Sequence, residues 1–140
     1  MFKYSEDTRL YWFNGNTFET NLKFELIGIL MGIAIYNQVI LDLHFPRACY
    51  KKLLNLQPNL QDLYEYMPEV AQSLEFILNT DEPDLENLLY QNFTVEVDVY
   101  GSTQVYELVP DGAELYVNQD NKNMYVEMLI DFIFNTHCEA

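Results

Sequence analysis

An uninterrupted apolar segment from Leu26 to Tyr36 constrains this chain more than any other feature. It lies within the sequence FELIGILMGIAIYN, which covers residues 24–37. An apolar run can form a buried helix or a buried strand, and the length of this one, which continues to Leu41, favours a helix. A membrane span needs about 20 apolar residues, so the segment is too short to be one. We therefore expect the central helix of a helical layer.

The composition of this segment predicts that the helix is buried. Its residues are apolar around the whole circumference, which is typical of a helix enclosed on all sides. Gly28 and Gly32 lie four residues apart on one face, although each glycine costs about 0.5–1 kcal/mol relative to alanine. We expect another helix to approach the backbone closely at these two glycines.

Charge and cysteine content narrow the classes of function. The 140 residues contain 22 Asp and Glu but only seven Lys and Arg, which gives a formal net charge of −15. Nucleic acids and anionic membranes bind clustered positive charge, so we expect neither as a partner. The acidity fits a basic protein partner or a solvated surface. The two cysteines, and the lack of an apolar signal segment before Trp12, favour the reducing cytoplasm or nucleus.

Most of the remaining chain is predicted to be helical. Residues 10–13 form a candidate short strand, followed by an Asn-Gly-Asn turn signal. A helix is expected from Phe45–Pro46, with Pro46 in the first helical position, and a short helix over 60–66. Pro68 starts a further helix that runs to about Leu78. The apolar residues of that helix follow the spacing of one face, namely Val70, Leu74, Ile77 and Leu78.

The second half of the chain adds β-structure and a last helix. Residues 93–100 alternate between apolar and polar, which predicts a half-buried strand. Two further short strands are expected over 104–108 and 114–117, which together would form an antiparallel meander. Asn118 is the expected N-cap of a last helix that runs to about Thr136. The predicted fold is α+β, with a helical part (1–56 and 124–140) and an inserted smaller subdomain (57–123).

The sequence contains no pattern that predicts enzyme chemistry. The five glycines are dispersed, and the two histidines, His44 and His137, lie far apart and lack the spacing of a zinc site. The pair His137–Cys138 could suggest a nucleophile, but neighbours on a helix point about 100° apart and do not face each other. Cys49 is expected to pack as a small apolar residue. We expect no catalytic residue, no metal and no cofactor, and interpret the chain as a binding module or part of a larger assembly.

Several segments resemble the N-lobe of HECT-type ubiquitin ligases. The principal one is FELIGILMGIAIYNQVILDLHFP, residues 24–46. The others follow in the same order over nearly the whole chain, and they are Tyr50, Leu53–Leu54, Gly101, Tyr106–Leu108, Pro110–Gly112, Asn121–Lys122 and Tyr125–Val126.

The resemblance implies a defined role within a larger ligase. A HECT N-lobe recruits a ubiquitin-conjugating enzyme, and a separate C-lobe holds the cysteine that accepts ubiquitin as a thioester and passes it to a substrate lysine. The Thr-Cys motif of the C-lobe is absent here, so the chain is expected to be inactive alone. The implied partners are a conjugating enzyme and, through the full ligase, ubiquitin.

The resemblance also implies a docking groove for the conjugating enzyme within the inserted subdomain. An aromatic side chain of the enzyme would enter this groove, as is common for an interface hot spot. The implied groove residues are Val70, Ser73, Leu74, Ile77, Leu88, Tyr90, Tyr125 and Leu129. The helical spacing of Val70, Leu74 and Ile77 fits core residues equally well.

Two further expectations follow from the resemblance. The full lobe has helices before the position of Met1, so an apolar patch is expected to stay exposed around residues 24–35. The alternative to a ligase fragment is a stand-alone acidic α+β interaction module without ligase activity. The coding sequence beyond Ala140 discriminates the two, because a C-lobe with a Thr-Cys motif would support the ligase.

Overall fold

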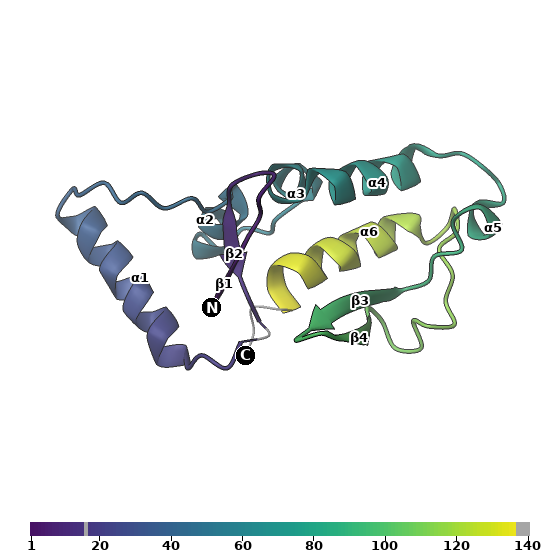
Figure 1. The fold of residues 1–140 in the computed structure, drawn as a ribbon. Coiled ribbons are helices and arrows are strands. Elements are labelled where there is room, and N and C mark those ends of the chain that lie inside the picture. Colours follow the sequence, from purple (N-terminus) through teal and green to yellow (C-terminus); the bar gives the residue numbers. More distant parts are fainter. Residues whose placement is uncertain (16, 137–140) are drawn as a thin grey trace.

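A small antiparallel hairpin lies between two helical regions of the molecule (Figure 1). The computed structural model describes residues 1–15 and 17–136. Strand β1 (Phe2–Tyr4) pairs with β2 (Tyr11–Phe13), which confirms the strand predicted at 10–13. The partner strand was not predicted, because three residues are too few to show an alternating pattern.

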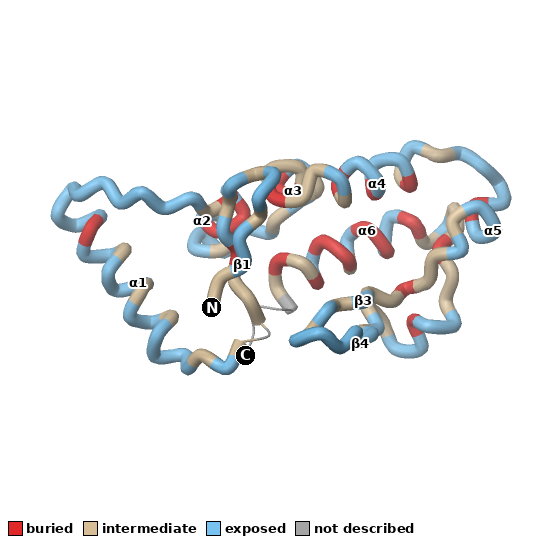
Figure 2. The backbone as a smooth tube through the Cα atoms, in the orientation of Figure 1, coloured by how far each residue is buried: buried red, intermediate tan, exposed pale blue. Residues whose placement is uncertain are grey.

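Helix α1 (Asn21–Tyr36) confirms the predicted helix but not its burial. Figures 1 and 2 show α1 standing away from the other helices, with most of its length exposed. Ala34 is its one buried residue, and no heavy atom other than the adjoining residues and backbone of the same helix lies within 4 Å of a Cβ placed at Gly28 or Gly32. The prediction of full burial and close helix approach is therefore wrong. The expected apolar patch is confirmed, and its large exposed side chains are Leu22, Leu26, Ile29, Leu30, Ile33, Ile35 and Tyr36.

The end of α1 also differs from the prediction. The helix ends at Tyr36, whereas the apolar sequence continues to Leu41. Gln38 has a φ of 57°, in the left-handed region, and this conformation turns the chain out of the helix. The following residues, 39–46, are irregular and lead into α2 (Arg47–Leu53). Pro46 was expected in the first helical position of α2. It is instead the N-cap, one residue before the helix begins at Arg47.

Local capping signals set the next helices. In α3 (Leu60–Tyr66), the Asp62 backbone N–H donates to the Asn59 side chain (3.2 Å), and the Asn59 N–H donates to the Asp62 carboxylate (2.8 Å). Helix α4 (Pro68–Asn79) starts at its proline as predicted, and α5 (Leu85–Leu89) follows after a loop. Helices α3 and α4 reproduce the predicted boundaries within one or two residues, whereas no element was predicted for the segment that forms α5.

Strands β3 (Thr94–Val99) and β4 (Ser102–Glu107) form a second antiparallel hairpin. The predicted third strand over 114–117 is wrong, since Tyr116 forms only an isolated bridge with Asn92. The Phe93 N–H donates to the carbonyls of Gly112 (3.0 Å) and Leu115 (3.1 Å). The segment after β4 therefore wraps around Phe93 instead of extending the sheet.

The last helix, α6 (Lys122–Asp131), lies between α4 and the β3–β4 hairpin (Figure 1). It continues into a π-helical turn, η1 (Phe132–Thr136). Asn118 is not the N-cap, because the helix starts three residues further on, after Asn121. The Asn118 side chain instead accepts hydrogen bonds from the backbone N–H groups of residues 120 and 121. It thus forms the turn that leads into the helix.

One apolar core joins the β1–β2 hairpin to the helices and to β3. Its largest fully buried side chains are Phe93, Phe134, Leu63, Leu85, Val117 and Pro46. Asp62 is a buried carboxylate and pairs with Lys51 at 2.6 Å. The architecture confirms the α+β fold class, while the division into a helical part and an inserted subdomain stays a prediction.

Candidate functional site

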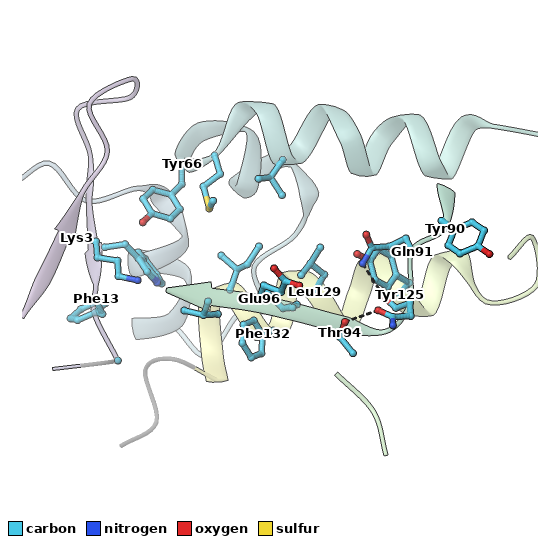
Figure 3. Close-up of a pocket in the computed structure, with 18 residues that line it drawn as sticks. Lys3, Phe13, Tyr66, Tyr90, Gln91, Thr94, Glu96, Tyr125, Leu129 and Phe132 are labelled. Atoms are coloured by element: carbon cyan, nitrogen blue, oxygen red, sulfur yellow. Dashed lines mark hydrogen bonds between the residues drawn. The ribbon is translucent and has the colours of Figure 1, made fainter. Parts of the chain in front are cut away.

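A pocket of about 720 Å³, which we call the central pocket, is the candidate functional site. It is bounded by the β1–β2 hairpin, the junction of α3 and α4, strand β3, and helix α6 with η1. Figure 3 shows Lys3 at one end of the pocket, beside the tip of β3, and Tyr90 at the opposite end. Segments far apart in sequence therefore contribute to a single cavity.

Four of the eight predicted docking residues line this pocket. Val70 contributes from α4, Tyr90 from the C-terminal end of α5, and Tyr125 and Leu129 from α6. Tyr125 and Leu129 are one helical turn apart and face the pocket together (Figure 3). Tyr90 is 76% exposed, so it is the most accessible of the four.

The other four predicted residues lie outside the lining of the pocket. Leu74 and Ile77 are core residues, with 3% and 7% of their surface exposed, on the α4 face that packs toward α6. Their helical spacing had fitted core residues as well as groove residues, and the structure places Leu74 and Ile77 in the core. Ser73 and Leu88 are exposed on α4 and α5. A role of these four residues in docking a partner remains a prediction.

Tyr125 is held in place by aromatic packing. Its ring meets Phe93 edge-on, with centroids 5.2 Å apart, and the residue is buried. Burial raises the pKa of the Tyr125 hydroxyl, because the charged phenolate would lose solvation there. The ring therefore provides a neutral, largely apolar wall at physiological pH.

Sequence reasoning missed the contribution of the N-terminal hairpin to this site. Lys3, Trp12 and Phe13 line the pocket, and Figure 3 shows Lys3 and Phe13 at the end away from Tyr90. They lie more than 100 positions before Tyr125, and no motif in the sequence connects them to it. Only the alternation of a strand could have assigned Trp12 to one face, and three residues are too few for that signal.

The polar groups differ between the two ends of the pocket. Near Tyr90, the Gln91 side chain donates to the Asn92 carbonyl (3.0 Å), and the Thr94 hydroxyl donates to the Asn92 side chain (2.5 Å). At the hairpin end, the indole Nε1 of Trp12 is buried and has no hydrogen-bond acceptor within the described residues. Glu96 lies between these ends (Figure 3).

The remaining chemistry of the described residues is sparse. Cys49 is buried in the core, as predicted for a packed apolar residue. Within residues 1–15 and 17–136, no three potential metal-ligating side chains come together, and no helix has the length and apolarity to cross a membrane. His137 and Cys138 lie outside the described residues.

Comparison with known proteins establishes the family. The whole chain, residues 1–140, matches the model of the HECT-domain (ubiquitin-transferase) family. The chain belongs to this family, which confirms the resemblance seen in the sequence.

Individual relatives carry related names. The chain is similar to the probable E3 ubiquitin-protein ligase HERC4 of Homo sapiens, with 49% identity over 135 residues. It is 40% identical over 134 residues to the human probable E3 ubiquitin-protein ligase HERC3, and 34% identical over 149 residues to the probable E3 ubiquitin-protein ligase HECTD2 of Mus musculus. Each match covers 96% of this chain but only 13% of HERC4 and HERC3 and 19% of HECTD2.

Proposed function

We propose that this chain is the part of a HECT ubiquitin ligase that docks a ubiquitin-conjugating enzyme. Ubiquitin would then pass to a catalytic cysteine elsewhere in the longer ligase, and from there to substrate lysines. The observation that carries the proposal is the central pocket, where Val70, Tyr90, Tyr125 and Leu129 surround one cavity. Membership of the HECT-domain family supports the reaction class.

The pocket has properties suited to an aromatic or aliphatic anchor from a partner. Its α6 wall is rigid, because Tyr125 and Leu129 are buried on a helix. Tyr90 is largely exposed and lines the same pocket, so its ring is available to contact an inserted side chain. Binding energy at protein interfaces concentrates where such an anchor is fully desolvated.

The charge of the chain fits a basic partner surface. The net charge of −15 produces a negative potential that accelerates encounter with a positively charged protein. Glu86 is an exposed carboxylate on α5, the helix that precedes Tyr90. An exposed charge of this kind contributes to the rate of encounter more than to the affinity, and its effect is screened by salt.

Leu74 and Ile77 would support docking indirectly. They lie in the contact between α4 and α6 and fix the position of the α4 wall that includes Val70. Ser73 and Leu88 would act at the periphery, where side chains exclude water from the contact but contribute little energy themselves.

Titration of the protein with a panel of ubiquitin-conjugating enzymes, by calorimetry and NMR shift mapping, tests the proposal. Tyr90→Ala should weaken binding by about thirtyfold, the effect of about 2 kcal/mol. Tyr36→Ala is a matched control, because Tyr36 is 87% exposed and lies on α1, away from the pocket. Equal affinity of Tyr90→Ala and Tyr36→Ala, or shifts confined to residues outside the pocket, would reject this site.

A further inference from the structure

Lys3 and Trp12 form a pair of hydrogen-bond donors at the hairpin end of the central pocket. They are directly opposite each other in the β1–β2 register, so their side chains emerge on the same face of the hairpin. Both side chains line the pocket, and Figure 3 shows Lys3 at its end. An ammonium group and an indole N–H therefore belong to one small region.

Neither donor is matched by an acceptor in the described part of the chain. Trp12 is 2% exposed, and its Nε1 is buried without a hydrogen-bond partner. Buried indole N–H groups usually have a partner, so an unpaired one points to a missing acceptor. The Lys3 ammonium forms no ion pair among the described residues, although the chain has 22 acidic residues.

The walls around these donors are apolar. Phe13, Val97, Phe132 and Ile133 line the same pocket as Lys3 and Trp12. A ligand that satisfies this end must therefore combine an acceptor with an apolar group. A carboxylate is the best acceptor here, because it accepts from the ammonium and from the indole N–H at once.

We propose that the hairpin end of the central pocket binds a polypeptide carboxylate carried next to an apolar side chain. The carboxylate lies between the Lys3 ammonium and the Trp12 N–H, and the apolar side chain packs against Phe13 and Phe132. The Trp12 N–H is covered by neighbouring atoms in this structure, so side chains around it must shift as the ligand enters.

The charge of Glu96 allows the predicted direction of the electrostatic effect on binding to be checked. It lies on the pocket wall and is exposed, so its negative charge opposes a bound carboxylate. Removal of this charge should tighten binding, whereas removal of the Lys3 charge should weaken it. A site that recognised only apolar groups would respond to neither change.

The single tryptophan of the chain makes the experiment direct, because the indole N–H gives one NMR signal. The protein is titrated with N-acetylphenylalanine and, in parallel, with N-acetylphenylalanine amide, which keeps the ring but lacks the charge. The carboxylate should shift the indole signal in a saturable manner and bind at least about fivefold more tightly than the amide. Equal binding of both probes, or no shift up to their solubility limit, would overturn the proposal.

Variants separate this site from a general apolar effect. Lys3→Gln should lower the affinity for the carboxylate probe about fivefold, and Glu96→Gln should raise that affinity about twofold. Lys23→Gln is the matched control, since Lys23 lies on α1 and pairs with Glu19, and it should leave binding unchanged. Binding that is insensitive to Lys3→Gln, or equally sensitive to Lys23→Gln, would also overturn the proposal.

This inference is independent of docking at the Tyr90 end. The small probes are applied to the protein without any conjugating enzyme, so their failure leaves the docking proposal standing. Conversely, loss of conjugating-enzyme binding in Tyr90→Ala says nothing about the indole signal. The two proposals can therefore fail separately.

Discussion

Leu74→Ala tests whether the apolar face of α4 is core, as the structure shows, or an open binding surface. Leu74 is 3% exposed and lies on the α4 face that packs toward α6. A buried leucine shortened to alanine loses transfer free energy and leaves a cavity, which together cost about 3 kcal/mol. Since a domain of this size is stable by about 5–15 kcal/mol, the variant should remain folded but be clearly weakened.

The measurement is urea unfolding followed by far-UV circular dichroism. The midpoint should fall while the slope of free energy against urea stays unchanged, because the same surface is exposed on unfolding. Val70→Ala is the comparison, since Val70 is half-buried on the pocket wall and should lose only about 1 kcal/mol. A loss below about 1 kcal/mol for Leu74→Ala would refute the packing described between α4 and α6.

Four further predictions concern other parts of the chain. The exposed apolar surface of α1 should cause self-association, which Ile33→Glu should reduce in sedimentation velocity; a monomer at high concentration would contradict this. Gly112→Ala should cost about 1–3 kcal/mol in urea unfolding, because an added Cβ would lie 2.5 Å from the Phe93 carbonyl oxygen; unchanged stability would place the turn elsewhere. The pKa of Tyr125 is raised in the folded state, so its contribution to the free energy of unfolding is present below pH about 10 and is lost as the pH rises through the folded-state pKa. Tyr125→Phe should therefore lose less stability at alkaline pH than the unmodified protein. Identical curves of stability against pH for the two proteins would be inconsistent with the burial of Tyr125. Incubated with activating enzyme, conjugating enzyme and ubiquitin, the chain should form no thiol-sensitive adduct, and an adduct lost on Cys138→Ala would disprove this.

Local signals in the sequence determined most of the helices and strands. Pro68 marks the start of α4, Asn59 and Asp62 cap α3, and the alternation over 93–100 predicts β3. Each signal acts within a few residues, through backbone hydrogen bonds or one side-chain periodicity, so it can be recognised without knowledge of distant contacts. The segments that resemble HECT N-lobes likewise predicted the family, which the family match over residues 1–140 confirmed.

Tertiary packing decided which apolar residues are buried. The sequence of α1 is apolar on every side, so it selects no face, and the other helices and hairpins pack against one another and leave α1 exposed. Leu74 and Leu88 are both apolar helix residues, yet one is core and the other is exposed. Burial depends on which surfaces meet, and a periodic pattern contains that information only when one side is polar.

The central pocket is the clearest case of a feature that only the fold creates. Its two ends come from the N-terminal hairpin and from the α5–α6 region, and none of the predicted residues that line it, Val70, Tyr90, Tyr125 and Leu129, belongs to the hairpin. The unpaired indole N–H of Trp12 depends on the positions of all its neighbours, including Tyr66 and Phe134, whose rings pack near it. A sequence can show that Trp12 has a donor, but whether an acceptor reaches it is a property of three-dimensional packing.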